Sequence, residues 1–437
     1  MRFDLVSIFP QFFDVLDLSL MGKAKESGAL KIAVHDLRDW TEDKHRTVDD
    51  TPYGGGAGMV MRADIWGKAI DDVVEGSGRR ILAVPTPSGK PLTQNDVRKL
   101  ARADQIIIAC GRYEGIDQRV VDHYRSTDDV EVFEYSIGDY VLNGGEVAGL
   151  VLVESIARLL DGFMGNPESL TEESFEGNVV EYPTYTRPAH WRGLGVPEVL
   201  QGGNHAAIDA WRRAKSLART AKVRPDLIRK TDPQSLSIED REVLARYGWL
   251  ASRDASHWDH VTIRPATLND VEGIAFVAAT TFPDACPPEV TPEAQREHIE
   301  NNLSKDVIAG WINSPRHRVM VADFHGQIAA YTMVELFNEG EGPDDVPHDI
   351  LAPAPTYMSK IYTLAQWRGS GLSGAIFEAA IDDARPHAFG SQIVLGTHKG
   401  NKRARKFYRR HGWETIGRRV FWVGGIKNED VVMVRDL

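Results

Sequence analysis

The sequence predicts an α/β protein with two α/β halves separated by a helical segment. Short apolar runs, each followed by a Gly-, Pro- or Asp-containing turn and an amphipathic stretch, recur from Met1 to about Leu160, and strand-helix alternation resumes after Val261. Buried parallel strands followed by helices give this pattern. The chain has 437 residues, more than one typical domain, so two or three domains are expected.

Each segment has its own signal. The expected strands of the first half are residues 3–9, 80–85, 105–110 and 129–133. Weak periodicity in residues 161–188 indicates a linker. After it comes a segment of helical composition, in which Asn204 is expected to open a helix. After a polar stretch, residues 261–266 and 358–364 read as strands, and residues 373–384 as a helix. The expected division is a first domain at 1–160, a linker at 161–188, a helical subdomain at 189–250 and a last domain at 261–437.

Composition restricts the class of protein. Cys110 and Cys286 are the only cysteines, which argues against a disulfide scaffold and a Cys-rich zinc site and fits a reducing cytoplasm. The most apolar run, 149–160, is interrupted by Glu154 and Arg158, so we expect neither a signal peptide nor a membrane span.

Charge is unevenly distributed. The net charge of −12 argues against a protein that coats nucleic acid non-specifically. One local run is strongly basic and is opposed only by Asp226; it comprises Arg212, Arg213, Lys215, Arg219, Lys222, Arg224, Arg229 and Lys230. This run is either a phosphate-binding element or a solvated helix face.

Three glycine-containing turns follow predicted strands of the first half. They are Pro85-Thr86-Pro87-Ser88-Gly89, Gly111-Arg112-Tyr113-Glu114-Gly115 after Cys110, and Ser136-Ile137-Gly138-Asp139-Tyr140-Val141-Leu142-Asn143-Gly144-Gly145. Loops at the carboxyl ends of strands bind ligands in open α/β sheets, and glycine lets the backbone approach a flat ring. Neither a P-loop nor a dinucleotide fingerprint is present, so a ligand held by its phosphates fits poorly. Each turn by itself is also compatible with ordinary turn chemistry.

Six ordered blocks between Met1 and about Tyr247 resemble the bacterial tRNA (guanine-N1)-methyltransferases that modify the guanosine 3′ of the anticodon. The blocks are His45-Arg-Thr-Val-Asp-Asp50, Pro52-Tyr-Gly-Gly-Gly-Ala-Gly-Met59, Gly111-Arg-Tyr-Glu-Gly115, Ser136-Ile-Gly-Asp-Tyr-Val-Leu142, Tyr185-Thr-Arg-Pro188 and Gly203-Asn-His-Ala206. The resemblance implies a trefoil-knotted fold of the SPOUT class, S-adenosylmethionine held by the three turns, and a homodimer with a shared active site. It also implies magnesium, for which the sequence shows no ligand cluster.

The resemblance assigns catalytic roles. The essential arginine of the family falls on Arg158, and its base, an Asp, falls on Glu173 in Thr171-Glu-Glu-Ser-Phe175, with Glu172 as a lesser candidate. Glu is one methylene longer, and its reference pKa is about 0.4 unit higher. Glu173 could still remove the guanine N1 proton while Arg158 stabilises charge on O6. Without the motif, both residues would read as surface charges.

Other parts of the first half would contact RNA under the same resemblance. Asp50, Tyr53 and Gly54 to Gly56 would shape the pocket or touch RNA, and the basic run would bind tRNA phosphates. The linker would become ordered when tRNA arrives and would exclude water during chemistry.

Two motifs in the second half resemble the GCN5-related N-acetyltransferases (GNAT). A strand ending at Leu364 leads into Gln366-Trp-Arg368-Gly369-Ser370-Gly371 and a helix, which would offer backbone N–H groups to the pyrophosphate of coenzyme A. The second motif runs from Asn401 to Trp413; by resemblance, Asn401 would bond near the pantetheine, Phe407 would pack in the core and Tyr408 would protonate the leaving thiolate.

Fold does not establish activity. Glu335 and His398 are candidate bases, and the run from Glu335 to Asp349 contains acids but no Lys or Arg, so it could attract a cationic amine or be a solvated loop. The leading hypothesis is a methyltransferase fused to an acetyltransferase with an unknown acceptor. The alternatives are a non-catalytic acyl-CoA sensor in the second half, and in the first half an RNA-binding protein without catalysis or a methyltransferase acting at another RNA position. The sequence does not reveal whether the halves communicate.

Overall fold

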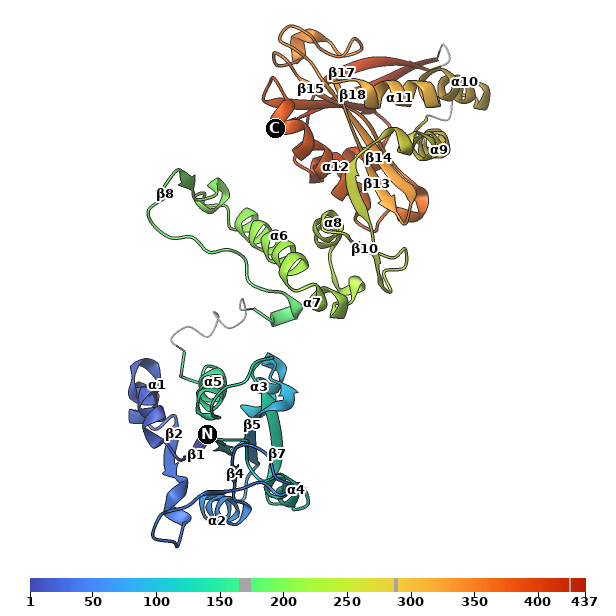
Figure 1. The fold of residues 1–437 in the computed structure, drawn as a ribbon. Helices are drawn as coiled ribbons and strands as arrows, with labels where there is room; N and C mark the ends of the chain where they lie inside the picture. Colours follow the sequence, from blue (N-terminus) through green and yellow to red (C-terminus); the bar gives the residue numbers. More distant parts are fainter. Residues whose placement is uncertain (165–173, 287–289, 424–425) are drawn as a thin grey trace. The chain divides into compact units, whose positions relative to one another are not determined.

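The computed structural model of the chain describes residues 1–164, 174–286, 290–423 and 426–437. It divides into two compact units, Met1–Glu172 and Glu173–Leu437. Figure 1 shows a sheet flanked by helices in the first unit, and a group of helices followed by a second sheet in the second unit. Both units combine helices with a sheet, which confirms the predicted α/β class.

The first unit is built on a parallel sheet. Its strand order is β2-β1-β6-β5-β7, and each neighbouring pair is parallel. The strands are β1 Arg2–Ser7, β2 Lys31–Asp36, β5 Arg80–Pro91, β6 Gln105–Ala109 and β7 Glu131–Ser136. Strand β6 reads Gln-Ile-Ile-Ile-Ala and is buried along its whole length, as expected for a strand covered on both faces. Four strands match predicted runs; β2 is not among them.

Helices cover both faces of this sheet (Figure 1). One face packs against η1 Pro10–Asp17, α1 Ser19–Glu26, α3 Gln94–Leu100 and α5 Glu146–Ala157. The other face packs against η2 Leu37–Trp40, α2 Ala63–Val73 and α4 Gln118–Arg125. A small hairpin pairs β3 Asp49–Asp50 with β4 Val60–Met61. Because the strands are parallel, the loops that leave their carboxyl ends meet at one edge of the sheet.

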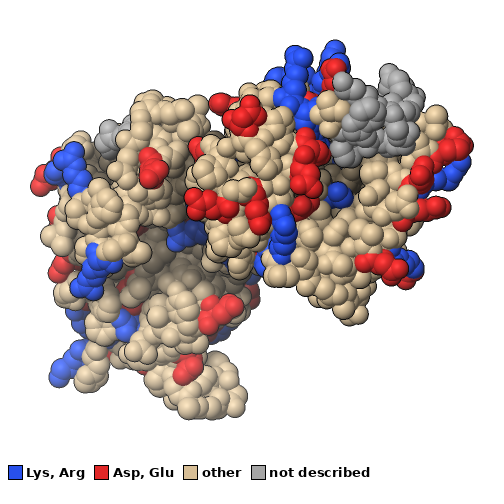
Figure 2. All heavy atoms as spheres, turned by 90° about the horizontal axis from the view of Figure 1, so that it is seen from above, with Lys and Arg blue, Asp and Glu red and all other residues tan. Residues whose placement is uncertain are grey.

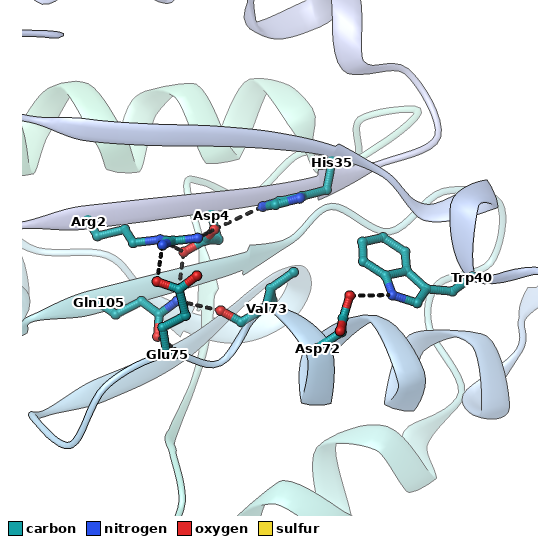
Figure 3. A network of polar contacts seen from close by, with 8 residues as sticks. All are labelled: Arg2, Asp4, His35, Trp40, Asp72, Val73, Glu75 and Gln105. Atoms are coloured by element: carbon teal, nitrogen blue, oxygen red, sulfur yellow. Dashed lines mark hydrogen bonds and ion pairs between the residues drawn. The ribbon is translucent and has the colours of Figure 1, made fainter.

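A buried carboxylate fixes the amino ends of the central strands (Figure 3). Asp4 is fully buried and accepts hydrogen bonds from Arg2 Nε at 2.8 Å and Gln105 Nε2 at 2.7 Å, while its other oxygen lies 2.9 Å from His35 Nε2. Gln105 also donates to the Val73 carbonyl of α2 at 2.7 Å. Burial opposes ionisation of Asp4, but these hydrogen bonds hold its pKa below the ordinary value. The network ties β1, β2, β6 and α2 together.

The second unit begins with a helical group. Asn204 caps α6 His205–Val223, as predicted, and accepts a hydrogen bond from the Ala207 N–H. The remaining elements of this group are β8 His190–Trp191, β9 Leu194–Gly195, η5 Glu198–Leu200, α7 Pro225–Lys230, η6 Pro233–Ser235, α8 Ile238–Arg246, β10 Trp249–Ala251 and β11 Trp258–His260. Leu217, Ile228 and Leu244 form a small core that joins the three α-helices.

A sheet of order β12-β13-β14-β15-β16-β18-β17 forms the rest of the second unit. The strands are β12 Thr262–Pro265, β13 His317–Phe324, β14 Gln327–Leu336, β15 Thr356–Thr363, β16 Gln392–His398, β17 Glu414–Val423 and β18 Ile426–Asp436. The α-helices around it are α9 Val271–Thr281, α10 Pro292–Asn302, α11 Lys305–Asn313, α12 Leu372–Ala384 and α13 Lys402–Arg410. Among the described strands of this sheet, β15 and β16 alone pair in parallel, through Thr356 and Tyr357. Beyond Tyr357 these two strands diverge, which opens the middle of the sheet.

Helix α8 packs directly on α12. Ala245 of α8 and the following Leu250 belong to the same buried apolar cluster as Leu372 and Ala375 of α12. The helical group and the large sheet therefore share one hydrophobic core inside the second unit.

A polar cluster lies at the edge of this contact. Glu242 of α8 is 9 % exposed and forms ion pairs with Arg410 and with His411, whose Nε2 lies 3.6 Å from Glu242 Oε2. On the other side of the imidazole, Nδ1 lies 2.8 Å from Glu378 Oε1, which also accepts a hydrogen bond from Arg435 at 2.6 Å. Burial disfavours the charged imidazole, but the carboxylates of Glu242 and Glu378 raise the pKa of His411 above its ordinary value.

Candidate active sites

The three predicted turns of the first unit meet around one cavity of about 380 Å³. Two of them follow the carboxyl ends of β6 and β7, whereas Pro85–Gly89 lies inside β5, where the pairing with β7 shifts register between Pro85 and Lys90. The predicted residues that line the cavity are Pro85, Thr86, Pro87, Ser88, Gly111, Arg112, Tyr113, Glu114, Gly115, Ser136, Ile137, Gly138, Tyr140, Val141, Leu142, Gly144 and Gly145. Its volume is within the usual range for small-molecule sites.

Close backbone contacts explain two of the glycines. The Gly145 N–H donates to the Gly111 carbonyl at 2.8 Å, and a Cβ on Gly145 would lie 2.8 Å from Pro85 Cγ and 3.0 Å from Cys110 Cα. Gly145 thus lets the three turns approach one another. Gly89 has a different role: it does not line the cavity, and a Cβ there would lie 2.6 Å from the Tyr135 nitrogen.

An ion pair fixes the wall beside α5. Glu146 is 1 % exposed; it accepts a hydrogen bond from Ser7 Oγ at 2.6 Å and lies 3.0 Å from Arg112 Nε through both carboxylate oxygens. The Arg112 guanidinium lies 4.7 Å from the ring centroid of Phe9 and 5.2 Å from that of Phe12. Arg112 is therefore held by a carboxylate and two aromatic rings while it lines the cavity. The sequence alone does not single out Glu146, whose only local signal is an acid in the first turn of an apolar helix.

Of the predicted catalytic residues of the first half, Arg158 is the one that the structure describes; it is the C-cap residue directly after Ala157, where α5 ends. Glu172 and Glu173 lie outside the described residues. In the loop of Asp50 and Gly54 to Gly56, Tyr53 is fully exposed.

The second unit contains a cavity of about 680 Å³ where β15 and β16 diverge. It is lined by both candidate bases, Glu335 and His398, and by Asn401 and Tyr408. Burial raises the pKa of Tyr408 to about 12, so its phenol stays protonated at neutral pH. The structure thus brings together the predicted acid and both candidate bases.

A neighbouring cavity of about 440 Å³ shares Ile361, Ala404 and Tyr408 with the first. At one end lies the amino terminus of α12, where the N-cap Gly371 adopts a φ of +99° and the Leu372 N–H donates to Ser370 Oγ at 3.3 Å. Cationic side chains also line this cavity; they are Arg368, Arg403, Lys406 and Arg410.

Several predicted residues of the second half have structural roles instead. Leu364 packs against the apolar core, and Ser370 Oγ donates to the Trp367 carbonyl at 2.7 Å. Gln366 is exposed and does not line the cavity, whereas Gly369 does. Asn401 Oδ1 accepts from the Ala404 N–H at 3.0 Å and caps α13. Sequence analysis missed Glu242 of α8, which also lines this cavity.

Neither a metal cluster nor a membrane helix occurs in the described residues. No group of three or more His, Cys, Asp or Glu side chains in the described part of the chain could hold a metal ion. Among the helices described, none is long and apolar enough to cross a membrane.

Two protein-family models match the chain, one over the first half and one over the second. A family model described as tRNA (guanine-1)-methyltransferase TrmD matches residues 1–230, and one described as the acetyltransferase (GNAT) family matches residues 282–413.

Curated relatives named tRNA (guanine-N(1)-)-methyltransferase match just over half of the chain. The protein of Thermobifida fusca is 56% identical over 254 residues, which is 57% of this chain and 96% of that protein. The protein of Leifsonia xyli subsp. xyli is 57% identical over 228 residues, 52% of this chain and 100% of that protein. The protein of Bifidobacterium longum subsp. infantis is 51% identical over 263 residues, 58% of this chain and 97% of that protein.

Proposed function

Because the chain belongs to the tRNA (guanine-N1)-methyltransferase family and carries a GNAT domain, we propose that it methylates N1 of the guanosine 3′ of the tRNA anticodon, with S-adenosylmethionine as donor. We further propose that its second half transfers an acetyl group from acetyl-CoA to an amine. The convergence of three glycine-containing turns on one cavity supports the first proposal most directly.

The cavity of the first unit suits S-adenosylmethionine. When bound, this cofactor supplies an activated methyl group on a sulfonium. Tyr113 and Tyr140 offer aromatic faces to an adenine, and the acids Glu114 and Glu134 line the same cavity and favour a cationic ligand. A Cβ on Gly138 would lie 3.0 Å from Tyr140 Cζ, so glycine lets the Tyr140 ring pack against this part of the wall. A trefoil knot through these turns stays part of the proposal.

The chain's own groups would then handle the acceptor. Glu173 removes the guanine N1 proton, and Arg158 stabilises the negative charge that grows on O6 as the proton leaves. Holding the acceptor nitrogen in line with the methyl group supplies much of the rate. We assign no step to magnesium, because the described residues offer no ligand cluster for it.

Exposed apolar side chains support a homodimer with a shared methyltransferase site. They lie on or beside η1, α1 and α5 and comprise Phe9, Phe12, Val15, Leu18, Leu20, Val147 and Val151. The rings of Phe9 and Phe12 contact Arg112, which lines the candidate cavity. A patch of this kind on one face usually marks an interface. Light scattering on the full chain should give a dimer, and Val151→Glu should shift it to a monomer; a wild-type monomer would refute the shared site.

The helical group carries the proposed tRNA contacts. The basic run falls on α6 and α7, where Arg213 pairs with Asp240 and Arg224 with Asp226, so part of its charge is neutralised. On the face that Figure 2 shows, described acidic and basic side chains lie interspersed in small groups. The pairing of part of the basic run fits a limited phosphate-binding surface better than a protein that coats RNA.

A methyl-transfer assay tests the first activity. Purified protein, tritiated S-adenosylmethionine and unmodified tRNA with guanosine 3′ of the anticodon should give N1-methylguanosine at that position only. Glu173→Gln should lower kcat about 10²-fold or more, since general-base help is of that order. Glu172→Gln is the matched control and should change kcat less than about threefold. If Glu173→Gln transferred methyl groups as fast as wild type, Glu173 would not be the base. Methylation at another nucleotide would show that the guanosine 3′ of the anticodon is not the substrate.

The second activity has its own test. In the proposed site, Tyr408 protonates the leaving thiolate, and Glu335 or His398 deprotonates the amine, since all three line the same cavity. The assay measures acetyl transfer to a panel of amines by wild type, Glu335→Gln and His398→Gln. The variant that loses kcat identifies the base. Binding of acetyl-CoA without transfer to any acceptor would favour the rival hypothesis, a non-catalytic acyl-CoA sensor.

A further inference from the structure

The α12 amino terminus, proposed above as the pyrophosphate site, lies against α8. A Cβ on Gly371 would lie 2.6 Å from the Arg241 carbonyl carbon and 2.8 Å from the Glu242 nitrogen, which are backbone atoms of α8. A Cβ on Gly374 would lie 2.7 Å from Glu242 Cγ. These distances leave no room for a methyl group. In this structure the two glycines accommodate a neighbouring helix.

The side chain that reaches this site is an anion. Glu242 is almost fully buried, pairs with Arg410 and lines the same cavity as Gly371 and Gly374. Its carboxylate therefore lies where a helix amino terminus and a cluster of cations favour negative charge. A pyrophosphate needs the same backbone N–H groups and the same cations. It would also be repelled by a buried carboxylate at contact distance.

We propose that Glu242 takes the place of the acyl-CoA pyrophosphate, so that docking of α8 and binding of acyl-CoA exclude each other. The inference rests on the proposed acyl-CoA site. Acyl-CoA would displace Glu242 and release α8 from α12, and a docked α8 would keep the acetyltransferase half closed.

The same contact would link acyl-CoA to RNA binding. Helix α8 also holds α6, because Arg213 Nη2 of the basic run lies 2.9 Å from Asp240 Oδ2 and Leu244 lies in the core shared with α6. Release of α8 would therefore alter the helices proposed to bind tRNA. Thermodynamic linkage makes the effect reciprocal, so tRNA would change acyl-CoA affinity by the same factor.

Calorimetric titration of acetyl-CoA into the full chain tests the exclusion. Glu242→Gln keeps the shape of the side chain and removes its charge, so the Kd for acetyl-CoA should fall at least tenfold. Glu239→Gln is the matched control: it lies on the same helix, 3.6 Å from the same Arg410, but is mostly exposed. The control Kd should stay within twofold of wild type. If wild type binds acetyl-CoA and Glu242→Gln binds it with the same or a higher Kd, the inference is wrong but the acyl-CoA site stands. If none of the three proteins binds acetyl-CoA, the acyl-CoA site is wrong as well.

Hydrogen exchange on the wild type provides a test without any substitution. Acetyl-CoA at saturation should speed exchange of the amides of α8, Ile238–Arg246, at least tenfold, because their helix loses its packing partner. S-acetylpantetheine, which has the thioester but no phosphate, should leave α8 exchange unchanged. Slower exchange in α8 with acetyl-CoA would show that α8 completes the site, and the exclusion would be wrong.

Discussion

Substitution of Gly145 by Ala tests the geometry of the methyl-donor cavity. The added Cβ would lie 2.8 Å from Pro85 Cγ, 3.0 Å from Cys110 Cα and 3.2 Å from the Gly111 nitrogen, all short of the 3.4 Å at which ordinary contact begins. Two of the three neighbours are backbone atoms, so the turns themselves must separate. Overpacking of this kind costs about 1–3 kcal/mol. If about half of that cost, about 0.5–1.5 kcal/mol, falls on the ligand-bound state, affinity for S-adenosylmethionine drops about 2- to 10-fold.

Calorimetric titration with S-adenosylmethionine measures the change in affinity. Hydrogen exchange in peptides of β5, β6 and α5 measures the change in stability, since a chain of several domains does not unfold in one two-state step. Gly67→Ala is the control: Gly67 lies in α2 with nothing within 4 Å of a Cβ, so Ala should stabilise the helix by about 0.5–1 kcal/mol and leave the Kd unchanged. If Gly145→Ala binds the cofactor as tightly as wild type, the turns do not form its site.

Three further predictions concern buried polar groups. Asp4→Asn should lower the stability of the first unit by about 1–3 kcal/mol, since the buried carboxylate that accepts hydrogen bonds from Arg2 and Gln105 is lost while Arg2 keeps its ion pair with Glu75; exchange in β1 peptides measures this, and a loss under about 1 kcal/mol would contradict it. Docking of α8 should weaken as the pH rises through the raised pKa of His411, because the protonated imidazole binds two carboxylates. Its contribution to the stability of docking is complete only below the pKa of histidine in the unfolded chain, and it is lost above the raised pKa of the folded state. Protection factors of α8 amides between about pH 5.5 and 8 should show this slope, and His411→Gln should abolish it. Tyr408→Phe should lower kcat of acetyl transfer about 10²-fold or more with little change in KM for acetyl-CoA; an unchanged kcat would remove Tyr408 as the acid.

Local patterns predicted four of the five strands of the first sheet, but not β2 at one of its edges. Strands covered on both faces, such as β6, are continuous apolar runs and stand out in the sequence. The edge strand β2, Lys31–Asp36, is only partly buried and mixes charged with apolar residues, so it has no such run. Strand β7 at the opposite edge was predicted, so the apolar run of a strand, and not its position in the sheet alone, decided whether the sequence could reveal it.

The same distinction holds for the sites. The turns were predictable because glycine and strand ends are local signals. The partners of Glu146 and Glu242 were not predictable, because they lie far away in the sequence. Ser7 is 139 residues from Glu146, and Arg410 is 168 residues from Glu242. No pattern over a few neighbours can reveal such pairs, and Glu242 joins segments that read as separate domains.

The shared core of α8 and α12 restricts how this chain can be divided. A cut in the polar stretch at 251–259 would appear harmless from the sequence, yet it would strip Ala245 and Leu250 from the surface of α12. A fragment starting at Val261 would then present apolar side chains to water and tend to aggregate. Biochemists who wish to isolate the acetyltransferase half should therefore keep the preceding helices attached to it.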